Sequence, residues 1–379
     1  MSQSSAMAED ITFFSVKQQK GRLRGVIEER LGKVLDHGAF IGGPEIAEPE
    51  AELKARTGAG AVVAVSSGTD AIVIPLMGEG IARDDAVFVP AFTYNATANA
   101  VVLAGATPVF VDIDSATFNI DATDLDARIE RVKQDGKLRP RAIIAVDLYG
   151  LPADYAALAR VAAKHDLLLI SDAAQSFGGG VGNRAVGALA PITTTSFFPT
   201  KTLGGYGDGG AIFAMDETRA KIWESIRWHG TDEVRRESVR IGMNGRLDSF
   251  QAAVLLAKLE IFDEEWQSRD KIAAIYRQRL AGRVRMFQMP SGVKHAWGLF
   301  TILVPRRDAF REALAKAGVP TSVYYTTPLH QHGAFKAYAP DRPLFNSESA
   351  AREVVSLPIH AYMSEAQAMR VCDAVLNLV

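Results

Sequence analysis

The sequence contains a single cysteine, Cys372, so the chain can form neither an internal disulfide bond nor a zinc site of several cysteines. We therefore expect the reducing environment of the cytoplasm. An excess of charge of one sign is also lacking, because 42 Lys and Arg stand against 44 Asp and Glu. A formal net charge of −2 gives no indication of nucleic acid or a membrane surface as a partner.

Long apolar runs are absent as well. No stretch approaches the roughly 18 uninterrupted apolar residues of a membrane-spanning helix. The first ten residues lack the basic and then apolar segments of a signal peptide, and we expect residues 1–12 to form a flexible tail. What is present, 379 residues with 48% hydrophobic side chains, is typical of a globular protein with two domains or one large domain and a smaller one.

Apolar runs rich in β-branched residues alternate with helical stretches over the first half of the chain, where helices are expected at Arg22–His37, Glu45–Thr57 and Leu151–His165. The expected strands are Ala61–Val65, Val87–Pro90, Pro108–Ile113, Ala142–Val146, Leu167–Ser171 and Thr193–Phe198. Such alternation predicts an α/β fold with parallel strands, right-handed crossovers and helices on both faces of the sheet.

The pattern changes after Phe213. The expected elements are helices at Arg246–Gln267, Ser268–Leu280, Arg306–Ala317 and Ser364–Leu378, and strands at Trp297–Val304 and Thr321–Tyr324. Long helices followed by a few separate strands indicate a smaller α+β unit. We expect a large domain over residues 13–254 and a small C-terminal domain over residues 255–379.

The stretch Thr193–Phe213 places one lysine, Lys201, between an apolar run and a glycine-rich loop. The run is expected to deliver Ser196 and then Lys201 to the edge of the sheet, and the glycines allow sharp turns and close approach to a ligand. A lysine in this position can form a Schiff base. The alternative is a solvated lysine beside an ordinary glycine-rich turn.

Two other strand ends carry polar groups. Ser66–Asp70, with the sequence SSGTD, joins a strand to a helix, and free N–H groups there can bind an anion. Simple capping of that helix by Ser67 or Thr69 is the alternative.

Asp172 directly follows another strand, where a side chain points into the ligand crevice of parallel sheets. Capping of the next helix is the alternative, and no metal ligands lie nearby in the sequence.

A lysine, an acid and an anion site on three strand ends form a complementary set. Pyridoxal phosphate (PLP) needs a lysine for its aldehyde, an acid for its ring nitrogen and N–H groups for its phosphate. The three together predict PLP as the cofactor, with no metal.

Seven blocks in chain order carry a resemblance to a known family. The chain resembles the DegT-type nucleotide-sugar aminotransferases, PLP enzymes with the aspartate-aminotransferase fold, from about Phe40 to the C-terminus. The blocks are SSGTDA, PAFTYNATANAVVLAGATPVFVDID, DLYG, SDAAQSFG, TSFFPTKTLGGYGDGGA, GMNGRLDSFQAAVL and SLPIHAYM. The resemblance implies a large domain with a mostly parallel mixed sheet flanked by helices, and a smaller C-terminal α+β domain.

The resemblance also assigns roles by position. It implies that Lys201 is the Schiff-base lysine and proton carrier, and that Asp172 pairs with the protonated ring nitrogen. The other residues expected at the cofactor are Gln175 at or behind the ring, Gly68, Thr69 and Ser196 at the phosphate, and Tyr94, or failing it Phe92, stacked on the ring. Either aromatic residue can instead be an ordinary core residue.

Further residues are expected at the substrate. In the family, the position of Asn244 reaches the phosphate of the neighbouring subunit, which implies a homodimer with two shared sites. Arg246 is expected to bind a carboxylate or phosphate, or else is a charge at a helix start. His229 is more consistent with a structural or rim residue than with a general base, and Tyr324 and Tyr325 are expected beside the sugar.

The resemblance implies transfer of an amino group from L-glutamate to a 3-keto nucleotide-linked sugar, for polysaccharide or O-antigen synthesis. The most similar members act on UDP-2-acetamido-3-keto-glucuronate. Where they read His-Tyr-Pro, this chain has Tyr324-Tyr325-Thr326, so a 3-keto-6-deoxy sugar on dTDP or UDP is a rival substrate. Two other functions stay open: a PLP-dependent sugar dehydratase, whose members replace the lysine by histidine, and a non-catalytic regulatory protein that binds PLP or a sugar nucleotide.

Overall fold

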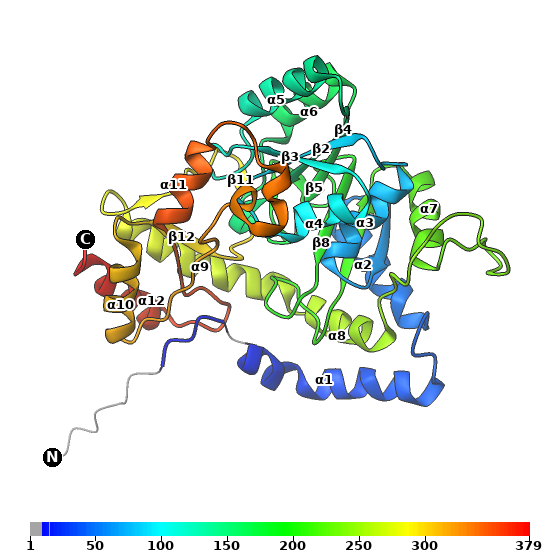
Figure 1. Cartoon of the computed structure of the whole chain (residues 1–379). Coiled ribbons are helices and arrows are strands. Elements are labelled where there is room, and N and C mark those ends of the chain that lie inside the picture. The colour runs from blue at the N-terminus through cyan, green and yellow to red at the C-terminus, as the bar shows by residue number, and fades with distance from the viewer. Residues whose placement is uncertain (1–9, 15) are drawn as a thin grey trace.

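A seven-stranded sheet forms the centre of the larger part of the molecule (Figure 1). The computed structural model describes residues 10–14 and 16–379. Across the sheet the strands are β1 (Ala61–Val65), β9 (Gly210–Ala214), β8 (Ile192–Ser196), β5 (Leu168–Asp172), β4 (Arg139–Val146), β2 (Asp85–Pro90) and β3 (Thr107–Val111). Strand β9 pairs antiparallel with both β1 and β8, and the other neighbouring strands of this sheet are parallel. The predicted mostly parallel mixed sheet of an α/β protein is confirmed.

Helices cover both faces of this sheet because successive strand side chains point to opposite sides. Val63 and Val65 pack on one face, whereas Val62 and Ala64 pack on the other. The first face carries α3 (Gly68–Gly78), α4 (Ala96–Leu103) and α7 (Glu217–Arg227). The second carries α5 (Ala122–Asp135), α6 (Tyr155–His165), α2 (Ala47–Thr57) and α8 (Ser249–Leu259). Helix α1 (Val16–His37) lies along the outside of α8 (Figure 1).

The C-terminal part is built on a small antiparallel sheet of β10 (Arg285–Met286), β12 (Phe300–Leu303) and β13 (Val354–Leu357). Its core is shared with α9 (Phe262–Leu280), α10 (Arg307–Lys316) and α12 (Glu365–Leu376). Helix α11 (Phe345–Glu353) precedes β13. A third sheet joins β11 (Val293–Lys294), β6 (Gly180–Val181) and β7 (Arg184–Ala185). Short 3-10 turns occupy Pro44–Ile46, Leu148–Gly150, Leu329–Gln331 and Gly333–Tyr338.

Two predicted elements of the C-terminal half are wrong. The helix expected over residues 246–267 begins only at Ser249, where Asp248 accepts a hydrogen bond from the Gln251 N–H, and it ends at Leu259. The chain turns at Ile261, and α9 then buries Phe262 against Phe177. The expected strand at 321–324 is a single bridge between residues 322 and 356. The domain boundary expected at 254/255 falls inside α8, and the division into domains stays a prediction.

The N-terminal tail was expected to be flexible up to residue 12. Residues 1–9 lie outside the described residues, but residues 10–12 are held against the C-terminal part. Ile11 is buried in its core, and the Gln367 side chain donates to the Asp10 carbonyl at 3.0 Å. Thr12 Oγ1 lies 3.3 Å from His360 Nε2. These three residues therefore have defined contacts with the C-terminal part, and the flexibility of the tail stays a prediction.

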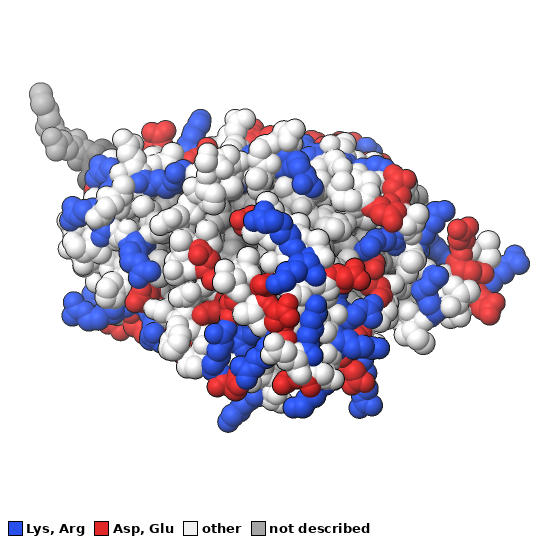
Figure 2. Space-filling view, turned by 90° about the horizontal axis from the view of Figure 1, so that it is seen from above, with Lys and Arg blue, Asp and Glu red and all other residues white. Residues whose placement is uncertain are grey.

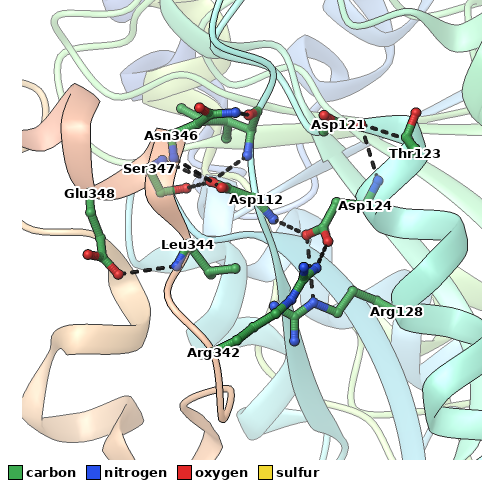
Figure 3. Close-up of polar contacts among 11 residues, drawn as sticks. Asp112, Asp121, Thr123, Asp124, Arg128, Arg342, Leu344, Asn346, Ser347 and Glu348 are labelled. Carbon is green, nitrogen blue, oxygen red and sulfur yellow. Dashed lines mark hydrogen bonds and ion pairs between the residues drawn. The ribbon is translucent and has the colours of Figure 1, made fainter.

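A polar junction joins the C-terminal part to the edge of the large sheet (Figure 3). Asp112, just after β3, accepts hydrogen bonds from the backbone N–H groups of Asn346 and Ser347 at 3.0 and 2.8 Å. It thereby caps the start of α11, an interaction worth about 1 kcal/mol. Beside it, Arg342 forms an ion pair with Asp124. This junction holds the segment that follows Tyr325 against the large sheet.

The surface carries charges of both signs. On the face seen from above, Lys and Arg are interspersed with Asp and Glu (Figure 2). Within the described part of the chain, no helix is both long enough and apolar enough to span a bilayer.

Candidate active site

Strand β8 and helix α3 meet at an anion-binding geometry. Ser67 caps α3, accepting from the Asp70 N–H at 3.1 Å, so the N–H groups of Gly68 and Thr69 in the first turn have no partner within the helix. A Cβ on Gly68 would lie 2.7 Å from the Cβ of Ser196. Glycine is therefore required for the end of β8 to approach the helix. The three residues predicted to bind phosphate are brought together.

Asp172 ends β5, next to β8, and is 5% exposed. Its carboxylate accepts from Thr97 Oγ1 at 2.8 Å and from the Ala174 N–H at 3.2 Å. Burial raises the pKa of Asp172, and the hydrogen bond from Thr97 and the charge of Lys201 partly oppose this rise. A buried carboxylate with only two donors retains lone pairs for a further partner.

Lys201 lies in the turn after β8, where its N–H donates to the Phe198 carbonyl at 2.8 Å. Burial lowers the pKa of the Lys201 amine, and the Asp172 carboxylate raises it in part. Among residues 10–14 and 16–379, no side chain forms a hydrogen bond or ion pair with Lys201 Nζ. The amine is thus free to react, and a larger share of it is neutral near pH 7 than for a solvated lysine.

Gln175 and the two tyrosines complete this side of the site. Gln175 Oε1 accepts from the Tyr149 N–H at 2.8 Å, and its Nε2 lies 3.5 Å from the Tyr325 hydroxyl. The Tyr149 hydroxyl donates to the Tyr324 carbonyl. The rings of Tyr94 and Tyr325 lie 6.2 Å apart, and Tyr94 is 56% exposed. Tyr325 therefore neighbours both Gln175 and Tyr94.

Phe92, the alternative stacking residue, is a core residue, since only 1% of it is exposed.

Two hollows open on Lys201. One, of about 410 Å³ including open solvent, is lined by Lys201, Gln175, Tyr324 and Tyr325. The other, of about 510 Å³, lies on the side of α9 and of residues 359–362. Phe14 lines both hollows.

One predicted cofactor residue, Asn244, and two predicted substrate residues, Arg246 and His229, follow helix α7 in the chain. Asn244 Oδ1 accepts from Arg246 Nε at 2.9 Å, and the Arg246 guanidinium lies 4.6 Å from the Trp228 ring centroid. His229 is exposed and adopts a positive φ of 61°. Within the described part of this chain, no hydrogen bond, ion pair or ring contact joins any of the three to the Lys201 amine, and their roles stay predictions.

The glycines of the loop after Lys201 were expected to allow sharp turns. The chain bends at residues 206–207, although none of the glycines between residues 204 and 210 adopts a positive φ. These glycines also allow close packing. A Cβ on Gly204 would lie 2.6 Å from the Phe198 carbonyl oxygen. The glycines hold the loop compactly around Lys201.

Comparison with known proteins gives this site a context. Residues 23–376 match the DegT/DnrJ/EryC1/StrS aminotransferase family. The chain belongs to this family. It is 40% identical to UDP-2-acetamido-2-deoxy-3-oxo-D-glucuronate aminotransferase of Pseudomonas aeruginosa, over 97% of this chain and 100% of the relative. It is 36% identical to dTDP-3-amino-3,4,6-trideoxy-alpha-D-glucose transaminase of Streptomyces venezuelae, over 98% of this chain and 97% of the relative.

A solved structure of this family shows the same fold. NtdA from Bacillus subtilis, described with the bound cofactor PMP, superposes with a TM-score of 0.90 at 29% identity, covering 99% of this chain and 86% of that one. The predicted membership of the family and the predicted fold are confirmed. Aminotransferases of this family depend on PLP, as expected from the sequence.

The residues of this family member fit PLP. Lys201 offers a free amine for the aldehyde, and buried Asp172 offers open lone pairs for a protonated ring nitrogen. The first turn of α3 and Ser196 offer donors for a phosphate. PLP, when bound, withdraws electrons from the carbon that carries the amino group.

Two residues of the site were missed by sequence reasoning. Thr97 lies in the first turn of α4 and donates to Asp172, and Tyr149 holds both Gln175 and the backbone of Tyr324. Both lie within the blocks PAFTYNATANAVVLAGATPVFVDID and DLYG. Neither follows a strand directly in the manner of Asp172, so the rule of strand ends did not select them.

Proposed function

We propose that the protein is a cytoplasmic aminotransferase that moves the amino group of L-glutamate to C3 of a 3-keto nucleotide-linked sugar, in polysaccharide or O-antigen biosynthesis. The observation that carries this proposal is the free amine of Lys201 beside the buried carboxylate of Asp172 at one sheet edge. The cytoplasm is supported by Cys372, which is buried and unpaired.

Lys201 moves the protons in both halves of this reaction. With its pKa lowered by burial, neutral Nζ can take the proton from Cα of glutamate and hold it close to the reacting carbon. In the second half the same amine delivers a proton to C3 of the sugar. Water is consumed when 2-oxoglutarate leaves and released when the sugar carbonyl binds, so the two halves balance.

The 3-position is better supported than the identity of the sugar. The names of the relatives from P. aeruginosa and S. venezuelae both place the nitrogen or keto group at position 3, on UDP in one case and dTDP in the other. Tyr324 lines the hollow beside Lys201, at the position where histidine is expected for the uronate enzymes. A phenol ring there does not supply a cation for a uronate, so a 6-deoxy sugar remains a rival.

The proposed function is tested with purified, PLP-loaded protein. We expect the visible near-violet absorbance of the lysine-linked cofactor to disappear on addition of L-glutamate, with one 2-oxoglutarate formed per site. A panel of UDP- and dTDP-linked 3-keto sugars, with and without a carboxylate at C6, should then restore the absorbance for at least one member. Protein that binds no PLP, or that ignores every amino donor, would contradict the proposal and favour a binding protein.

The active unit is proposed to be a homodimer with shared sites. Asn244 is exposed and forms a bridge with Trp228, whereas Arg246 pairs with Val65 at the end of β1. The preceding segment contains Ile241, which is 84% exposed. This placement supports a role in the site of a second copy.

Mixing two inactive variants tests this arrangement. Lys201→Ala and Asn244→Ala chains, each weak alone, should regain about a quarter of wild-type activity when refolded together, because half of the dimers are mixed and each has one intact site. Light scattering on the same samples reports the dimer. If activity is not regained although mixed dimers form, Asn244 acts within its own chain and the shared site is wrong.

A further inference from the structure

Arg269, on helix α9, is a buried cation with too few partners. It is 7% exposed, and its Nε and Nη2 have no hydrogen-bond partner among the described residues. The nearest anion is the Glu265 carboxylate, which lies one turn earlier in the helix and 3.9 Å from Nη1. At that distance the pair is an ion pair without a hydrogen bond.

Glu265 is engaged elsewhere. Its carboxylate accepts from Gln19 Nε2 at 2.9 and 2.8 Å and from the Tyr362 hydroxyl at 2.7 Å. Burying a guanidinium without hydrogen-bond acceptors is unfavourable, and burial accordingly lowers the pKa of Arg269. The arrangement leaves guanidinium N–H groups available for a further anion.

Arg269 lines the same hollow as Lys201. This hollow, of about 510 Å³, lies between α9, the segment around Phe14 and residues 359–362. His360 lines it too, and its Nδ1 is buried without a partner. Burial lowers the pKa of His360 to about 4, so the imidazole is neutral near pH 7. Lys201 and Arg269 thus line the same hollow, and Glu265 neutralises only part of their positive charge.

We propose that Arg269 binds a carboxylate of the amino-acid donor. The inference rests on the proposed function and deepens it. A guanidinium offers two parallel N–H donors that match a carboxylate, and the donor must place its amino-bearing carbon at Lys201. The two hollows share Phe14 and Lys201, but only the second is lined by Tyr324 and Tyr325, which leaves that second hollow to the sugar.

Binding of glutarate to the PLP-loaded protein tests the site directly. Glutarate has both carboxylates of glutamate but no amine, so it binds without reacting. By calorimetry, Arg269→Met is expected to weaken glutarate binding by about tenfold or more, the loss of a hydrogen bond between two charged groups. Arg269→Lys, which keeps the positive charge but loses the two parallel N–H donors, should restore part of the affinity. Arg277→Met is the matched control, since Arg277 is exposed on the same helix.

A second comparison shows which carboxylate is bound. The absorbance change on adding L-glutamate or L-alanine measures the first half of the reaction without any sugar. If Arg269 binds the side-chain carboxylate, Arg269→Met slows the reaction with glutamate and leaves the reaction with alanine unchanged. If Arg269 binds the α-carboxylate, the substitution slows the reactions with both donors to a similar extent. Either pattern supports the proposal.

An unchanged glutarate affinity in Arg269→Met, with a lower melting temperature, would overturn the proposal and make Arg269 a structural partner of Glu265. If Arg269→Met does not fold, the double variant Glu265→Gln/Arg269→Met removes both buried charges and takes its place. The two proposals can fail separately. Wild-type protein that binds glutarate through Arg269 but ignores glutamate contradicts the aminotransferase function alone, whereas normal transamination with unchanged glutarate binding in the variant contradicts this site alone.

Discussion

Lys201→Ala is expected to lower turnover by at least about a thousandfold. The variant loses both the amine that links to the cofactor and the base that moves the proton, and each of these roles alone accounts for large rate factors. Stopped-flow absorbance with glutamate measures the loss. The near-violet absorbance should be missing before any substrate is added, which separates a lost linkage from a slow reaction.

Lys258 provides a control of similar character. Its amine is also buried, burial lowers its pKa to about 8, and it lies 4.4 Å from the Tyr206 ring centroid. Lys258→Met should keep the absorbance of the linked cofactor and react with glutamate, although its melting temperature changes. Normal turnover in Lys201→Ala, or loss of the linkage in Lys258→Met, would contradict the assignment of Lys201 as the reactive lysine.

Asp172→Asn is expected to lower turnover by about a hundred- to a thousandfold, in the range found when one buried electrostatic partner is removed. An amide of the same shape cannot keep the ring nitrogen of PLP protonated. The amide can still accept from the Ala174 N–H through Oδ1 and can donate from Nδ2 to Thr97 Oγ1, so the fold should be retained. Single-turnover kinetics with glutamate measure the loss.

The same variant shifts a pH dependence. The Asp172 carboxylate raises the pKa of Lys201 against the lowering by burial, so removing its charge lowers that pKa further. Since only the neutral amine reacts, the rate at which PLP-free protein takes up PLP should reach half its maximum at a lower pH than in wild type. Asp112→Asn, which alters a carboxylate at the far edge of the sheet, should leave this midpoint unchanged. A midpoint that moves upward, or not at all, would contradict the predicted coupling.

Much of the fold could be predicted because its strands are buried on both faces. Such strands appear as short unbroken apolar runs, and Ala61–Val65 has the same bounds in the sequence pattern and in β1. The C-terminal half was less predictable. Residues 246–267 form an unbroken helical pattern in which the break at Ile261 has no proline or glycine to mark it. Residues 321–324 include two β-branched side chains and one tyrosine, yet the segment pairs with β13 only once.

The candidate site also contains residues that the sequence could predict and one that it could not. Lys201, Asp172 and Ser196 follow strands, and parallel strands bring their ends to one edge, so their proximity follows from the topology. Arg269 lies in the middle of an amphipathic helix, where its charge looks like part of a solvated face. Only the packing of α9 against residues 359–362 and the N-terminal segment shows that it is buried.

The attachment of residues 10–12 to His360 and Gln367 joins the two ends of the chain. During synthesis on the ribosome, this segment is made before the large sheet, but His360 and Gln367, which hold it, are made after that sheet. The strands of the large sheet are complete by residue 214, about 150 residues before the partners of the N-terminal segment are made. A nascent chain therefore exposes Lys201 in an open site from the time this lysine is made until residues 359–362 have joined the hollow.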